Sequence, residues 1–252
     1  ALSPDSPNSV QLIVTCFMLG MAMGTLVMGP ISDAVGRKPV IAGAIVIYVL
    51  AALACWAAPS LEAMIASRVV MGFAAAAPRV VSMALVRDLY SGRSMARIMS
   101  FVMVVFTLVP ALAPSIGHYI TVWFGWRFVF ICFGVFGALG AGWIMIRQPE
   151  TLAPENRRPL NMRRIADATK EVYSIRITRL SIIAQMMVSA TILSLLSSTQ
   201  QIFDITFGQG AHFHLWFGGI AIFSASASFI NARIVTKLGM RAIIRFTFSA
   251  QI

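Results

Sequence analysis

The sequence predicts an all-α membrane protein whose long apolar helices cross a bilayer. Of its 252 residues, 58% are hydrophobic and only 12% are charged, whereas soluble domains carry about 25% charged residues. Apolar runs recur along the chain, and about 20 such residues are enough to cross about 30 Å of hydrocarbon. The runs are continuous rather than alternating, which favours helices over the strands of a β-barrel.

Seven apolar runs are long enough to be membrane spans. The first contains Gly20, Gly24 and Gly29, small residues at a spacing that lets neighbouring helices approach closely. A basic segment separates the fifth span from the sixth. We expect the spans at residues 10–31, 39–58, 61–86, 95–122, 126–146, 180–203 and 213–235, with the start of another at 242–252.

The positive charges of the chain lie on one side of this arrangement. Lys and Arg number 2 at residues 37–38, 3 at 87–97, 8 at 147–179 and 4 at 233–245, and the loops in between hold none. The positive-inside rule places these basic loops in the cytoplasm. The net charge of +11 is therefore an orientation signal, and we expect no nucleic-acid binding. Arg127, beside one of the uncharged loops, is an exception to the pattern.

The basic segment divides the chain into three predicted parts. Residues 1–146 form a first transmembrane half with five spans, residues 147–179 a cytoplasmic linker, and residues 180–252 the start of a second half. Within the linker, cations alternate with apolar residues such as Met162, Ile165 and Val172. This pattern is typical of an amphipathic helix on anionic lipid; a regulatory or partner site is the alternative.

The polar loop after the first span has a counterpart late in the chain. Residues 31–38 (ISDAVGRK) align with residues 234–241 (IVTKLGMR), so that Gly239 and Arg241 repeat Gly36 and Lys38. Two halves related by a parallel repeat are typical of secondary transporters. In the second half one span (180–203) precedes the span that leads into the copy, whereas in the first half no span precedes the corresponding span at residues 10–31. We therefore expect a complete protein to have a helix before residue 10 and most of a second half after residue 252.

The polar loop also carries a family motif. Gly29, Asp33, Gly36, Arg37 and Lys38 resemble the signature loop between the second and third helices of the major facilitator superfamily. The resemblance implies a helical bundle of two six-helix repeats, incomplete here. It also implies that the loop latches the two halves together on the cytoplasmic side.

Two of the spans carry further motifs of the superfamily. The segment from Arg68 to Gly72 resembles its fourth-helix motif, and Pro110, Pro114 and Gly117 fit the fifth-helix motif of antiporters. The resemblance implies a coupling role for the arginine and a role of the prolines in limiting proton leak. Charges inside a membrane are functional by default; for Arg68, snorkelling to a span end is the alternative.

Arg79 lies three helical turns after Arg68, on nearly the same face. No family role is associated with it, and it could line the cytoplasmic half of the cavity or snorkel. None of the nine acidic residues lies in the middle of a span, so we expect the proton-carrying acid on the helix before residue 10. The cysteines at 16, 55 and 132 lie in apolar runs, which favours packing over a disulfide or a metal site.

Three short segments narrow the resemblance. Residues 87–90 (RDLY), 125–127 (GWR) and 149–152 (PETL) are similar to segments of the Bcr/CflA-type drug-resistance transporters, which are proton-coupled exporters. The resemblance implies a monomeric efflux antiporter of the bacterial inner membrane. Its partners would be the lipid bilayer, protons and a small hydrophobic or amphipathic substrate, with the proton gradient in place of any cofactor.

Two alternatives to efflux remain open at this stage. An importer of the same fold would show the same motifs, and a truncated chain could insert into the membrane and transport nothing. An enzyme is not expected, because the sequence shows no nucleophile–base pair, metal-ligand cluster or phosphate-binding loop.

Overall fold

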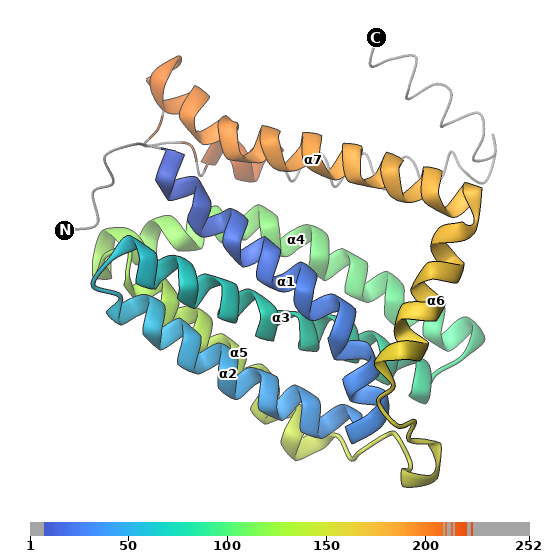
Figure 1. Cartoon of the computed structure of the whole chain (residues 1–252). Coiled ribbons are helices and arrows are strands. Elements are labelled where there is room, and N and C mark those ends of the chain that lie inside the picture. The colour runs from blue at the N-terminus through green and yellow to red at the C-terminus, as the bar shows by residue number, and fades with distance from the viewer. Residues whose placement is uncertain (1–7, 209, 211–212, 214, 221–222, 224–252) are drawn as a thin grey trace. The chain divides into compact units, whose positions relative to one another are not determined.

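The computed structural model describes residues 8–208, 210, 213, 215–220 and 223 (Figure 1). This part of the chain contains helices and no strand, which confirms the all-α prediction. A 3-10 turn, η1, covers Pro154–Asn156. The α-helices are α1 (Asn8–Val35), α2 (Arg37–Ala57), α3 (Leu61–Leu89), α4 (Gly92–Phe124), α5 (Phe128–Arg147), α6 (Met162–Ser174) and α7 (Arg176–Ile205).

Six of these helices are long and apolar enough to cross a membrane; the short α6 is not among them. The helices extend beyond the predicted spans: α3 continues to Leu89, and α7 begins at Arg176. The apolar runs mark what lies in hydrocarbon, whereas a helix continues into the polar headgroup layer. The predicted spans at 213–235 and 242–252, and the repeat residues Gly239 and Arg241, fall wholly or mostly outside the described residues.

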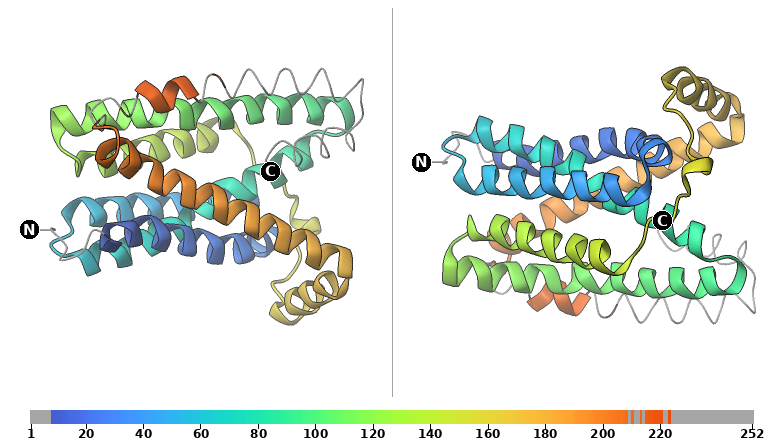
Figure 2. Two further views of the ribbon diagram at one scale, coloured as in Figure 1. Left: turned by 90° about the horizontal axis from the view of Figure 1, so that it is seen from above. Right: turned by 90° about the horizontal axis from the view of Figure 1, so that it is seen from below.

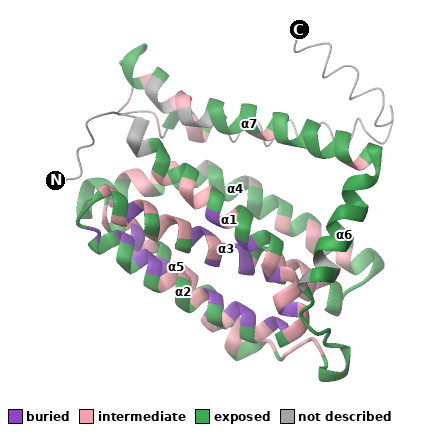
Figure 3. Ribbon diagram, in the orientation of Figure 1, coloured by how far each residue is buried: buried purple, intermediate pink, exposed green. Residues whose placement is uncertain are grey.

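The chain divides into two compact units, and the first contains residues 1–96 and 120–198. In this unit α3 packs against α1 and α2, and α2 also packs against α5. Helices α1, α2 and α3 run side by side (Figure 2). The buried residues gather where these helices face one another (Figure 3). The predicted division into two halves and a linker stays a prediction.

Two clusters of buried apolar side chains form the core of the first unit. One cluster lies toward the end of the bundle where α1 ends and α2 begins. It joins α1, α2 and α3 and consists of Met28, Val40, Ile41, Ala44, Ala76, Ala77 and Val81. Near the other end the second cluster joins α2, α3 and α5 and consists of Ala51, Ala52, Cys55, Ala58, Met64, Met71 and Phe130. Many of these residues are small, which allows the helix backbones to lie close together.

The contact between α1 and α3 depends on glycines from both helices. An added Cβ on Gly20 would overlap the carbonyl oxygen of Val69, and one on Gly72 would overlap that of Phe17. At Gly24 an added Cβ would overlap backbone of α3. The glycine spacing noted in the first span therefore corresponds to a close helix crossing.

Candidate functional site

Charged side chains meet around Arg37, where α1 ends, α2 begins and α3 ends. The Arg37 side chain is only 9% exposed. Its Nη1 donates to Ser32 Oγ and to Asp33 Oδ1, both at 2.6 Å, and its Nε donates to Asp88 Oδ2 at 3.0 Å. One guanidinium thus ties the ends of three helices together. We call Ser32, Asp33, Arg37 and Asp88 the Arg37 cluster.

Gly36 makes the turn between α1 and α2. Its φ is 120°, a conformation that is accessible essentially to glycine alone. Its N–H donates to the Ser32 carbonyl at 3.1 Å, and an added Cβ would lie 2.8 Å from Glu150 Oε2. The position therefore excludes a side chain by its backbone conformation, and an added Cβ would also displace the Glu150 carboxylate.

Glu150 caps the N-terminus of α2 from a distant part of the chain. Its Oε1 accepts from the N–H of Arg37 and its Oε2 from the N–H of Lys38, each at 3.0 Å. Gly36, the N-cap residue, has no side chain to make such bonds. A carboxylate at this place satisfies free N–H groups and lies favourably in the field of the helix dipole.

The residues that follow Glu150 continue across the ends of the helices. Thr151 Oγ1 donates to Asp88 Oδ2 at 3.3 Å, and the Arg158 N–H donates to the Asp33 carbonyl at 2.9 Å. We call residues 150–158 the strap. The strap contacts α1, α2 and α3, so it holds the loop between α1 and α2 against α3.

Glu150, the first residue of the strap, makes the stability of the fold depend on pH. Partial burial acts to raise the pKa of the Glu150 carboxyl, but the backbone N–H groups of Leu152, Arg37, Lys38 and Thr151 outweigh it, so this pKa lies below its ordinary value. A group with a depressed folded-state pKa stabilises the fold above its unfolded pKa, about 4.3 for Glu. That stabilisation is lost as the pH falls through the folded-state pKa.

We expect Glu150→Gln to lower the free energy of unfolding at pH 7 by about 1 kcal/mol, as for other lost caps. The variant should also lose less stability than the unaltered protein as the pH falls below about 4. Thermal unfolding of the detergent-solubilised chain across this pH range measures both effects. Glu155→Gln, an exposed residue of η1, is the matched control, and equal pH slopes for the two variants would contradict the cap.

Arg68 is a second charged residue inside the helix packing. It is half-buried in α3, and its Nε donates to the Ile13 carbonyl at 3.2 Å. Its Cζ lies 4.7 Å from the ring centre of Phe17 and 5.6 Å from that of Phe130. The guanidinium therefore packs between aromatic rings of α1 and α5. Within the described part of the chain, no carboxylate forms an ion pair with it.

Comparison with known proteins places this arrangement in a family. Residues 4–252 match the family described as Major Facilitator Superfamily. The chain belongs to the major facilitator superfamily. Its members are transporters rather than enzymes, which agrees with the prediction. With six candidate spans, the chain is a multi-pass integral membrane protein.

Several similar proteins are named for drug resistance. A bicyclomycin resistance protein homolog from Haemophilus influenzae is 35% identical over 252 residues, which cover 98% of this chain and 62% of the relative. A chloramphenicol resistance protein from Pseudomonas aeruginosa is 32% identical over 139 residues, 54% of this chain and 33% of the relative. Multidrug resistance protein MdtL from Citrobacter koseri is 31% identical over 125 residues, 50% of this chain and 32% of the relative. The predicted resemblance to drug-resistance transporters is confirmed.

The structure brings most of the superfamily's loop motif together. Asp33 and Arg37 form an ion pair, Gly36 makes the turn, and Lys38 contributes a backbone N–H to Glu150. Asp88 and Glu150 belong to the short segments RDLY and PETL, and the sequence alone indicates a partner for neither of them. One signal was available for Glu150: an acid directly after a span, on the side where another helix begins with an uncapped glycine.

The other predicted site residues that the structure describes lie on α3 and α4. Gly72 is buried in the contact between α1 and α3, and Arg79 is exposed on α3. Pro110, Pro114 and Gly117 all lie inside α4, which continues through both prolines. The predicted coupling, cavity and leak roles of these residues stay predictions.

The hydrogen bonds of Arg127 account for its position on the side of the chain that otherwise lacks Lys and Arg. Its Nη1 donates to the Trp56 carbonyl at 2.8 Å and its Nη2 to the Ala58 carbonyl at 2.9 Å. These are the free carbonyls at the C-terminus of α2, where a cation is also favoured by the helix dipole. Its Cζ lies 5.2 Å from the ring of Trp126. The arginine of the GWR segment is therefore a helix cap on the sparsely charged side.

We expect Arg127→Gln to lower the free energy of unfolding by about 2 kcal/mol, the range for hydrogen bonds to a charged group. Arg127→Lys should cost less, because an ammonium keeps the charge but lacks the fork that reaches two carbonyls. Thermal unfolding in detergent measures both variants. Arg93→Gln, at an exposed arginine of α4, is the control; equal losses at residues 93 and 127 would refute the cap.

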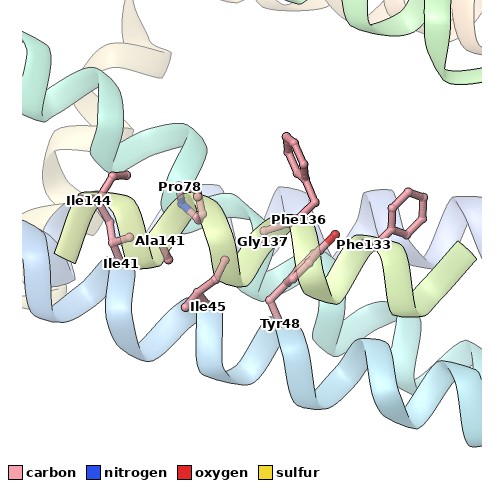
Figure 4. Close-up of a pocket in the computed structure, with 11 residues that line it drawn as sticks. Ile41, Ile45, Tyr48, Pro78, Phe133, Phe136, Gly137, Ala141 and Ile144 are labelled. Carbon is pink, nitrogen blue, oxygen red and sulfur yellow. The ribbon is translucent and has the colours of Figure 1, made fainter. Parts of the chain in front are cut away.

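An apolar groove of about 330 Å³ lies between α2, α3 and α5. In Figure 4, Ile45 and Tyr48 project from α2 toward α5. The groove offers van der Waals contact and one phenol hydroxyl, but no charged group with which to hold an ionic ligand. None of the predicted site residues lines it. The lining residues are Ile41, Ile45, Tyr48, Ala75, Pro78, Phe133, Phe136, Gly137, Gly140, Ala141 and Ile144.

Proposed function

We propose that the protein exports drugs or small metabolites across the bacterial inner membrane in exchange for protons. The observation that carries this proposal is the similarity to a bicyclomycin resistance protein homolog along 98% of the chain. The chain spans 62% of that relative's length, so the activity proposed is that of the whole protein. The mechanism proposed is alternating access, in which two halves rock around a central cavity.

The Arg37 cluster supplies a rigid surface for such rocking. The Asp33 side chain is 47% exposed even though Arg37 binds its Oδ1. An exposed carboxylate can attract the positive N-terminus of a helix from the other half. We propose that this contact forms in one of the two states of the transporter and breaks in the other, with the basic loops in the cytoplasm.

Arg68 supplies a fixed charge for proton coupling. A guanidinium stays protonated at every working pH, and in an apolar setting it lowers the pKa of any carboxylate brought beside it. The proposed carrier is an acid on a helix before residue 10 of this chain. Its proton would be released when Arg68 is close and taken up when Arg68 is distant. The proton gradient drives transport, with no further cofactor and with the monomer as the working unit.

We expect a drug-hypersusceptible bacterium carrying the intact gene to extrude a fluorescent drug, and we expect a protonophore to stop it. Arg68→Gln should lower the rate by about tenfold or more, since a lost charged contact costs about 1.5–3 kcal/mol. Arg93→Gln, at an exposed arginine of α4 outside the predicted spans, is the control. Blots of the membrane fraction check that each variant is present.

Each alternative has its own outcome in this assay. Extrusion that persists with the protonophore would refute proton coupling. Net uptake of the drug into cells would identify an importer instead. Absence of any movement, with the protein present in the membrane, would contradict the transport proposal itself.

A further inference from the structure

Helix α6 is amphipathic by its sequence pattern. At the spacing of an α-helix, one side of it carries small and apolar residues at positions 162, 165, 166, 169, 172 and 173. Val172 and Tyr173 are about half exposed, at 50% and 52%. Asp167 and Glu171 lie on the opposite side, one helical turn apart. Position 164, an arginine, falls on the same side as the two acids, so the helix has an apolar face and an opposite face with charges of both signs.

Cations lie between the two faces and on both flanks of the helix. Arg163 and Lys170 are seven residues apart, so they share a position at the border of the apolar face. Residues 157–179 contain 7 Lys and Arg against 2 acidic residues. This is the arrangement in which long basic side chains extend from an apolar face to a surface of negative charge.

The chain holds both ends of α6 at one membrane surface. The Arg158 N–H is bonded to the carbonyl of Asp33, near the end of the spanning helix α1. Three residues separate Arg158 from Met162, so the two Cα atoms lie at most about 14 Å apart. At the other end, one residue separates Ser174 from Arg176, where the span of α7 begins. No span intervenes, so both attachments lie on the same side of the bilayer.

These two attachments determine the orientation of α6 relative to the membrane. A helix of 13 residues is about 20 Å long and too short to cross the bilayer, which takes about 17 residues or more. Because one end starts within a short reach of α1 and the other adjoins α7, the helix lies along the membrane surface and cannot project into water by its full length.

We propose that α6 lies in the headgroup layer and binds anionic phospholipid. Arg163 and Lys170 would contact the lipid phosphates, while Val172 and Tyr173 would enter the boundary between headgroups and acyl chains, where tyrosine is favoured. Asp167 and Glu171 would face the water, away from the negative surface. Each cation near such a surface strengthens binding by about fivefold.

Electron paramagnetic resonance of nitroxide labels tests this proposal on the whole chain in lipid nanodiscs. A label is placed at Val172→Cys or, as the matched control, at Glu171→Cys. Cys55 is buried, and Cys16 and Cys132 lie within spans; a sample without an introduced cysteine corrects for their reaction. Discs of phosphatidylcholine alone are compared with discs that also contain phosphatidylglycerol.

With phosphatidylglycerol present, we expect the label at residue 172 to collide with oxygen and the label at residue 171 with a water-soluble nickel chelate. Arg163→Gln and Lys170→Gln should each weaken the response to phosphatidylglycerol about fivefold, whereas Asp167→Asn should not weaken it. Equal nickel collisions at residues 171 and 172 would overturn the proposal. So would immersion of residue 172 that is independent of phosphatidylglycerol and of the two cations.

Discussion

Gly72→Ala is expected to lower the free energy of unfolding by about 3 kcal/mol, the upper range for overpacked sites. The added Cβ would overlap the carbonyl oxygen of Phe17 in α1. That oxygen belongs to the backbone and cannot rotate away as a side chain would. The two helices would have to separate, and other contacts along them would be lost with this one.

Gly20 offers a test of the same contact from the other helix, because its Cβ would overlap the carbonyl oxygen of Val69 in α3. We expect Gly20→Ala to cost as much as Gly72→Ala. The double variant should cost less than the sum, because helices already separated by one Cβ have room for the second. Thermal unfolding in detergent gives all three values.

Gly43→Ala is the matched control for these glycine variants. An added Cβ at Gly43 in α2 would meet nothing within 4 Å, and alanine favours a helix over glycine by about 1 kcal/mol. We therefore expect Gly43→Ala to be neutral or stabilising. A Gly72→Ala variant as stable as Gly43→Ala would show that α1 and α3 do not approach as closely as described.

Arg37→Met is expected to lower the free energy of unfolding by about 2–3 kcal/mol, in the range for hydrogen bonds to charged groups. The change keeps an apolar stem but leaves the Asp33 and Asp88 carboxylates and the Ser32 hydroxyl without their common donor. Arg37→Lys should fall in between, since one ammonium cannot reproduce the fork of a guanidinium. Thermal unfolding in detergent is again the measurement.

Two further variants separate the Arg37 cluster from charge in general. Lys38→Met removes the neighbouring cation, for which the described residues provide no ion-pair partner, and should cost little. Adding Asp88→Asn to Arg37→Met should recover part of the loss, because one unpaired carboxylate is removed. Equal losses for Arg37→Met and Lys38→Met would contradict the cluster.

The sequence was sufficient for the properties that depend on short windows of residues. Apolar runs of sufficient length identified six described helices as spans, and the motif from Gly29 to Lys38 identified the superfamily. The turn at Gly36 was also foreseeable, since the glycine stands between two helical runs. Each of these inferences needs only neighbouring residues, because hydropathy and turn chemistry are local.

The partners of Arg37 could not be predicted in full. Asp33 is four residues away, within reach along one helix, but Asp88 and the capping Glu150 are 51 and 113 residues away. Nine acids and twenty cations allow many pairings. Arg127 is a similar case: its sequence position marked it only as an exception, and its carbonyl partners lie 69 and 71 residues earlier.

What the sequence determined by itself is therefore the class, the spans and the family of this protein. Only the tertiary structure decided which groups meet: that Glu150 caps α2, that Arg37 joins three helix ends, and that Gly72 is required where Gly43 is not. The physical reason is that the preference of a segment for lipid is the sum of the hydropathies of its own residues, which the sequence gives directly. A hydrogen bond or an overlapping Cβ, in contrast, exists only once two distant segments have been brought within a few ångströms of each other.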